Sequence, residues 1–221
     1  MSSAASDVYK RQTLDLVSGQ TVIDSNDNWQ QHPDAQTIAS IGYDPDDPLD
    51  AAIYACLAPG AYTALLKGKG DANGIGIVEV FDADVGTPYL FAISTRSVVD
   101  TVHKVAIGGF IIEGDQSKDV AIKGRGPSVA VPEGVTRLSD PQLVLYDGTG
   151  AQLEFNNNWG DADNAAAITA AGMEPGDPLE SVILRNLAPG AYTAIMSGVG
   201  GTTGVGIVEI IDLSGGAVEP Q

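Results

Sequence analysis

The sequence predicts an all-β protein built from tandem jelly-roll-like β-sandwich modules, each with one short helix. Three observations lead to this fold class. The 27 Gly and 12 Pro residues are spread singly along the 221 residues, as expected for short strands joined by tight turns. Hydrophobic residues make up 43% of the chain and charged residues 18%, which is enough apolar material for a core. A long segment also occurs twice, which predicts two modules rather than one large domain.

The repeat has a period of 130 residues, because Trp29 and Trp159 are separated by that number, as are Pro59 and Pro189. Both prolines lie in the octapeptide LAPGAYTA. Solenoid repeats have periods of roughly 20 to 50 residues, so a unit of this length is a whole domain. Residues 83–142 occur once. We therefore interpret residues 13–88 as a partial sandwich repeat and residues 89–221 as a complete one.

Residues 1–12 show no strand or helix periodicity. The string SAASDVYKRQ within them resembles translated sequencing-adapter DNA, of the kind found at the ends of metagenomic gene fragments. We expect these residues to be a disordered tail, an artefact of sequencing or of expression, and exclude them from the fold.

The complete repeat predicts about eight strands. They are expected at residues 90–94, 104–112, 119–123, 143–146, 152–155, 181–187, 191–196 and 205–211. A short helix is expected between the fifth and sixth strands, capped by Asp163 or Asn164 and closed by Gly172, with a counterpart in the first copy. The sequence Ala-Pro-Gly-Ala between the sixth and seventh strands fits a type II turn. The last strand is apolar on both faces, as a central strand should be.

The succession of ISTR, GGFII, GPS, DPQLVLYD, NNNW, LAPGAYTA and GIVEI resembles a repeat module of large secreted and surface proteins of environmental bacteria. It is also distantly similar to the bacterial pre-peptidase C-terminal β-sandwich, which shares the LYD hairpin and the PGxYT segment. The resemblance covers nearly all of residues 13–213. It implies a β-sandwich appendage or stalk, and it implies no catalytic residues.

The charge of the chain excludes one class of partner. A net charge of −18 and a pI near 4.1 would repel phosphate backbones, so we expect no nucleic-acid binding. No apolar run approaches the ~20 residues that cross a bilayer, so we expect no membrane insertion. The single cysteine, Cys56, has Asn186 as its counterpart and is expected to be a small strand residue without a redox role.

Polar residues follow the predicted hairpin in both copies, and two interpretations stay open. Oxygen ligands at this density suit Ca²⁺, which takes six to eight of them. Alternatively, the side chains bond to local backbone in a turn and cap the following helix. The candidate calcium ligands are Asp24, Asn26, Asp27, Asn28, Glu154, Asn156, Asn157, Asn158 and Asp161.

Trp29 and Trp159 end these polar runs and also have two interpretations. They could stack on a sugar ring, which would make the module a carbohydrate binder. In the second interpretation, each tryptophan lies at the end of a strand and covers the edge of the hydrophobic core.

Four charged residues are candidates for structural ion pairs. They lie in otherwise apolar or mildly polar strands, where a half-buried pair would fix strand register: Arg96, Arg125, Glu79 and Glu209. The two histidines, His32 and His103, are far apart in the repeat, so no zinc site or catalytic triad can be assembled. The sequence therefore predicts a protein that is not an enzyme.

These observations favour a non-enzymatic structural or adhesive repeat module of a bacterial surface or secreted protein, located outside the cell. Two alternatives remain: a self-assembling subunit of an extracellular fibre, and a carbohydrate-binding appendage of a secreted hydrolase. The partial repeat is expected to leave strand edges open, so the expected partners are neighbouring copies of the chain or adjacent repeats. If the module is a carbohydrate-binding appendage, glycans are expected partners as well.

Overall fold

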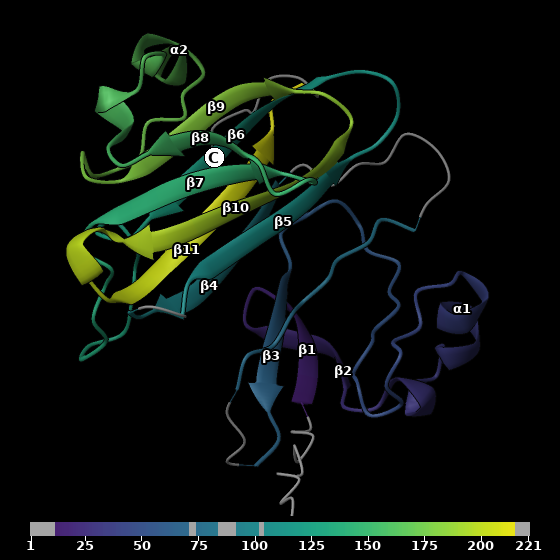
Figure 1. Cartoon of the computed structure of the whole chain (residues 1–221). Helices are drawn as coiled ribbons and strands as arrows, with labels where there is room; N and C mark the ends of the chain where they lie inside the picture. The colour runs from purple at the N-terminus through teal and green to yellow at the C-terminus, as the bar shows by residue number, and fades with distance from the viewer. Residues whose placement is uncertain (1–11, 71–73, 84–91, 102–103, 215–221) are drawn as a thin grey trace, which may run out of the picture. The chain divides into compact units, whose positions relative to one another are not determined.

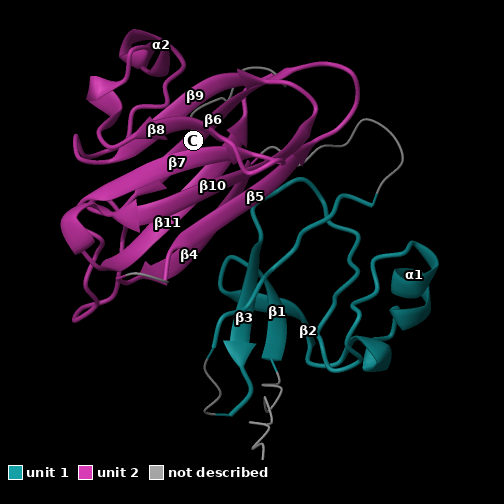
Figure 2. Ribbon diagram, in the orientation of Figure 1, with its two compact units in different colours: residues 1–88 teal, residues 89–221 magenta. Residues whose placement is uncertain are grey.

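A computed structural model of the chain describes residues 12–70, 74–83, 92–101 and 104–214. The chain divides into two compact units, unit 1 (residues 1–88) and unit 2 (residues 89–221), coloured separately in Figure 2. The predicted tail lies outside the described residues except for Gln12, which is already the first residue of a strand. No helix among the described residues is long and apolar enough to cross a membrane.

Unit 2 is a sandwich of two four-stranded antiparallel sheets (Figure 1). One sheet has the order β5-β10-β7-β8 and the other β4-β11-β6-β9. The strands are β4 (Ala92–Val99), β5 (Ala106–Ile112), β6 (Lys118–Arg125), β7 (Pro141–Asp147), β8 (Gln152–Asn156), β9 (Ser181–Leu187), β10 (Gly190–Gly198) and β11 (Gly204–Asp212).

This strand order is that of a jelly roll, in which successive strands alternate between the two sheets except at one hairpin. Here the exception is β7 and β8, which pair directly. The predicted all-β, jelly-roll-like sandwich is therefore confirmed. The apolar strand β11 is central, as its pattern predicts, because it pairs with β4 on one side and β6 on the other.

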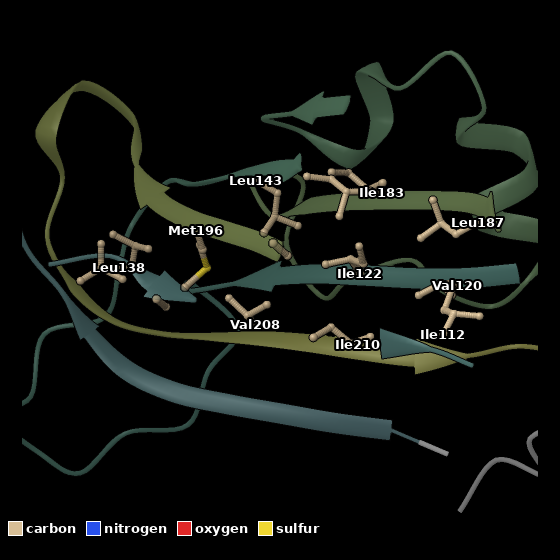
Figure 3. Packing of buried hydrophobic residues seen from close by; sticks show 14 residues of the cluster. Ile112, Val120, Ile122, Leu138, Leu143, Ile183, Leu187, Met196, Val208 and Ile210 are labelled. Carbon is tan, nitrogen blue, oxygen red and sulfur yellow. The ribbon is translucent and has the colours of Figure 1, made fainter. Parts of the chain in front are cut away.

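The core of unit 2 lies between its sheets. Side chains from both sheets meet there, and ten of them are labelled in Figure 3. Leu143 on β7, Ile122 on β6 and Val208 on β11 have no exposed surface. Alternate residues of each strand contribute to this cluster. A shift of one residue in the pairing register of a strand would therefore turn its apolar side chains to the solvent.

The Ala-Pro-Gly-Ala connection differs from the predicted type II turn. It links β9 in one sheet to β10 in the other, so it does not close a hairpin. Gly190 has φ of 153°, whereas a type II turn needs about 80° at that position. Because this connection passes from one sheet to the other, its backbone dihedral angles differ from those of a hairpin turn.

The short helix is present in both units, as α1 (Ala35–Ser40) and α2 (Ala165–Ala170), each preceded by a 3-10 turn, η1 (Trp29–Gln31) and η2 (Trp159–Asp161). A further 3-10 turn, η3 (Val199–Gly201), joins β10 to β11. Asn164 occupies the N-cap position of α2, but its side chain does not cap the helix. Its Nδ2 instead donates to the carbonyl of Leu184, 2.8 Å away, and so ties the helix to β9.

Unit 1 contains one sheet, with the order β2-β1-β3. Its strands are β1 (Gln12–Ser18), β2 (Thr21–Asn26) and β3 (Thr63–Gly68). They are the repeat counterparts of β7, β8 and β10, and they pair in the same order as those strands do in unit 2.

The described residues of unit 1 form no second sheet. Residues 51–57 and 74–82, the counterparts of β9 and β11, lie outside any strand, contrary to the prediction from the repeat. In unit 2, β6 lies between β9 and β11 and pairs with both. No described segment takes that place in unit 1, so its two segments have no neighbouring strand to bond. We call residues 51–57 and 74–82 the open segments.

Candidate functional site

The open segments of unit 1 are the feature that sets it apart from unit 2, and each is anchored to the sheet that does form. Ala52 N donates to Asn26 Oδ1 at 3.1 Å, and Trp29 N donates to the carbonyl of Asp50 at 2.8 Å. The equivalent bonds in unit 2 run from Val182 N to Asn156 Oδ1 at 3.0 Å and from Trp159 N to Glu180 O at 2.9 Å. The first open segment thus begins as β9 does.

The second open segment is also in contact with the sheet of unit 1. A Cβ placed on Gly76 would lie 2.4 Å from Leu66 Cδ2. The counterpart Gly206 packs equally closely on Met196, with 2.6 Å to its Cε. At Gly206 the carbonyl oxygen of Arg125 would also lie 2.9 Å from such a Cβ, so a larger residue would disturb the backbone there, whereas at Gly76 only the Leu66 side chain would have to move.

The open segments expose apolar residues that the closed sandwich buries. Val78 is 40% exposed and Val80 48% exposed, whereas their counterparts Val208 and Ile210 are 0% and 7% exposed. Leu57 is 43% exposed, against 3% for Leu187. Exposed apolar surface of this kind is a feature of interaction sites.

The lone cysteine also lies in an open segment. Cys56 is exposed and not part of a strand, so the expected strand position is not formed. Its counterpart Asn186 lies on β9, where Nδ2 donates to Asp119 Oδ1 of β6 at 2.8 Å. The cysteine therefore occupies a position that faces β6 in the closed sandwich.

One of the predicted ion pairs is present. Arg125 Nη1 on β6 lies 3.2 Å from Glu209 Oε1 on β11, and both side chains are about a quarter exposed. Arg96 is exposed on β4 and forms no ion pair with any described residue. Glu79 is exposed in the second open segment rather than placed in a strand.

Arg125 belongs to a larger polar network that the sequence did not indicate. Its Nε donates to Ser128 Oγ at 3.2 Å, and Ser128 Oγ lies 2.8 Å from both carboxylate oxygens of Glu180. Glu180 is fully buried and also accepts from Gly126 N and Ser128 N, each at 2.9 Å. Glu180 follows Asp-Pro-Leu and directly precedes β9, and this sequence context does not indicate that its side chain is buried.

The candidate calcium ligands are held largely by contacts within the protein. Asn26 Oδ1 accepts from Asn28 N as well as Ala52 N, and Asn28 Oδ1 accepts from Gln30 N at the start of η1. Asn156 makes the bond to Val182 already described, and its Nδ2 donates to the carbonyl of Asn158. These are bonds of the kind that the turn interpretation expects.

The acidic candidates have basic or amide side chains as partners. Asp24 Oδ2 lies 3.2 Å from Nε2 of the buried His32, Asp27 pairs with Lys69, and Glu154 Oε2 lies 3.1 Å from Arg185 Nη1. Asp161 Oδ2 accepts from Asn158 Nδ2 at 2.8 Å. Asn157 Oδ1 and Asn158 Oδ1 are buried without a hydrogen-bond partner among the described residues. Within the described ranges, no group of three His, Cys, Asp or Glu residues is arranged to hold a metal ion.

The two tryptophans are half-buried in the 3-10 turns. The backbone bonds of Trp29 and Trp159 described above tie these turns to residues 50 and 180. A shallow depression nearby in unit 1 is lined by Thr13, Ser25, Asn26, Asp27 and Gln31, without either tryptophan.

Asp15 is a buried carboxylate in the sheet of unit 1. Lys67 Nζ on β3 and Ser25 Oγ on β2 lie 2.8 and 2.6 Å from its oxygens. The hydrogen bonds from Lys67 and then Ser25 hold the pKa of Asp15 below its usual range. This carboxylate therefore links all three strands of unit 1.

Comparisons with known proteins add a distant likeness to solved structures. No family model matches the chain, and no curated protein matches it. Among solved structures, it is similar to the pre-peptidase C-terminal domain of the collagenase from Bacillus anthracis, with 9% identity and a TM-score of 0.35. The match covers 54% of this chain and 89% of that one. Values this low transfer neither fold nor function from one chain to the other.

Proposed function

We propose that this chain is a non-enzymatic structural module of an extracellular or cell-surface protein, and that it joins polypeptides by strand pairing. One observation carries the proposal. The same repeat is a closed eight-stranded sandwich in unit 2, whereas in unit 1 two anchored segments remain unpaired with their apolar side chains exposed. Unpaired backbone beside exposed apolar side chains is the feature by which sheets recruit further strands.

The net charge of the chain and the polar network of unit 2 both fit a structural role. A net charge of −18 keeps the closed parts of the surface soluble and repels nucleic acid. The polar network around Glu180 is used within the sandwich, where its donors and acceptors satisfy one another. A structural role fits both features.

Sedimentation velocity of the full chain at micromolar concentration tests this proposal. We expect self-association, because in the absence of another partner the open segments of two chains can cover one another. A strictly monomeric profile would contradict the proposal. Filaments of regular spacing in electron micrographs would extend it to a fibre subunit.

Paired variants locate the association. Ile75 and Ile77 in the second open segment are 93% and 79% exposed, and replacing both by Asp should restore a monomer. Val98 and Ile111 in unit 2 are 63% and 69% exposed, and they lie on the edge strands β4 and β5, each of which pairs with one neighbour. Replacing those two by Asp adds the same charge and should leave the association unchanged.

A further inference from the structure

Unit 2 shows what kind of segment would fill the gap in unit 1. In unit 2, β6 pairs antiparallel with β9 from Lys118↔Leu187 to Gly124↔Ser181, and with β11 from Ile207↔Arg125 to Asp212↔Val120. The strands β9 and β11 do not pair with each other, because β6 separates them. The open segments of unit 1 are the repeat counterparts of these two neighbours. The missing strand is therefore of the β6 type.

The apolar residues of the open segments fit such a strand. Val120 and Ile122 of β6 are buried in the core of unit 2, where Ile122 lies opposite Ile210 of β11, and Val208 lies opposite Gly124. Val78 and Val80 occupy the equivalent positions in the second open segment and are about half exposed. A strand that brought its own Val and Ile to this place would cover them.

The charged residues of unit 1 fit it as well. Glu180, which holds Gly126 and Ser128 beyond the end of β6, has Asp50 as its counterpart. Glu209, the partner of Arg125, has Glu79 as its counterpart. Residues 116–128 contain Lys118, Lys123 and Arg125 against the single acid Asp119, so a segment of this type is basic where unit 1 is acidic.

We propose that the open segments of unit 1 bind, between them, an extended basic segment with the chemistry of residues 116–128. That chemistry is a Val-Ala-Ile run of small apolar residues, followed by an Arg that pairs with Glu79. The β6 strand of a second copy is not available, because it already pairs with both neighbours in its own unit 2. The inference rests on the proposed joining role and names the partner segment for it.

Cys56 provides a direct test, because it is the only cysteine in the chain. In unit 2, Asp119 of β6 lies opposite Asn186, the counterpart of Cys56. The probe is a synthetic peptide of residues 116–128 in which Asp119→Cys carries a thionitrobenzoate group as a mixed disulfide. When the peptide binds in the β6 register, the Cys56 thiolate attacks the peptide sulfur, a new disulfide forms and coloured thionitrobenzoate is released.

The matched control is the same peptide with Lys123→Cys in place of Asp119→Cys. Lys123 lies opposite Val182, whose counterpart is Ala52, four residues from Cys56. With the full chain, we expect the Asp119→Cys peptide to react at least about tenfold faster than the Lys123→Cys peptide, because binding raises the effective concentration at one register only. The Val78→Asp chain should lose this difference, whereas the Val98→Asp chain should keep it.

Equal rates for the two peptides would overturn the inference. If the chain self-associates in sedimentation and the rates are equal, the joining role stands and the partner segment is wrong. If the chain is monomeric and the rates are equal, both proposals fall. Faster reaction of the Asp119→Cys peptide, together with loss of self-association on saturation by peptide, would support both.

Discussion

At the scale of single residues, Glu180 is a buried carboxylate that organises the end of β6. Replacement by Ala removes the acceptor for Gly126 N, Ser128 N and Ser128 Oγ and leaves these donors without a partner. We expect Glu180→Ala to lower the free energy of unfolding of unit 2 by about 1–3 kcal/mol. Urea unfolding monitored in unit 2 measures the effect. Glu113→Ala, an exposed glutamate beyond β5 with the same charge change, should have little effect.

Asp15 makes the stability of unit 1 dependent on pH. Its pKa is lowered by the bonds from Lys67 and Ser25, so folding favours the charged carboxylate. The stabilisation is therefore complete above the pKa of the unfolded chain and is lost as the pH falls below about 4. An NMR titration of the Asp15 carboxyl should give a midpoint below that of an unfolded aspartate. Lys67→Met should move the midpoint upward, and an unchanged midpoint would contradict the role given to Lys67.

The polar turns give a test of the calcium interpretation. The amide oxygens of Asn26 and Asn156 already accept backbone hydrogen bonds, which supports a turn role. We therefore expect the midpoint of thermal unfolding to be the same with millimolar calcium and after addition of a chelator. A midpoint that rises with calcium and falls with chelator would favour a bound ion, since a ligand of the folded state must stabilise it.

At the scale of elements, β5 shows how the two faces of a strand differ. A Cβ on Gly108 would lie 2.7 Å from Ile210 Cδ1 and 3.0 Å from Val208 Cγ1 in the core. For Gly109, the nearest atom is the carbonyl of Tyr192, 3.9 Å away. We expect Gly108→Ala to destabilise unit 2 by about 1–3 kcal/mol and Gly109→Ala to be nearly neutral. Equal effects in thermal unfolding would contradict the placement of Gly108 against the core.

Local sequence patterns predicted the strands of unit 2 well because each strand there pairs with at least one neighbouring strand. The strands expected at 143–146 and 152–155 form the β7–β8 hairpin, where Asp147 Oδ1 accepts from Thr149 N and Ala151 N in the turn. The same patterns failed for 51–57 and 74–82, although 74–82 and β11 have nearly the same sequence. A strand needs hydrogen bonds from a neighbour, and that neighbour is not part of the local pattern.

The candidate site could be predicted only in outline. Open edges in the first copy followed from the single occurrence of residues 83–142. The Arg125–Glu209 pair also followed from charged residues in apolar strands. Glu180, Ser128 and the position of Cys56 opposite β6 could not be foreseen, because they depend on the crossing of strands that are far apart in the sequence.

At the scale of the whole molecule, two segments with the same sequence pattern differ in pairing: residues 204–212 are paired in unit 2, and residues 74–82 are unpaired in unit 1. Hydrogen–deuterium exchange of the full chain at low concentration tests it within one sample. Amides of residues 204–212 should exchange slowly, whereas those of residues 74–82 should exchange at rates close to those of an unfolded chain. Slow exchange in both segments would contradict the claim, because it would show that unit 1 already holds its missing strand.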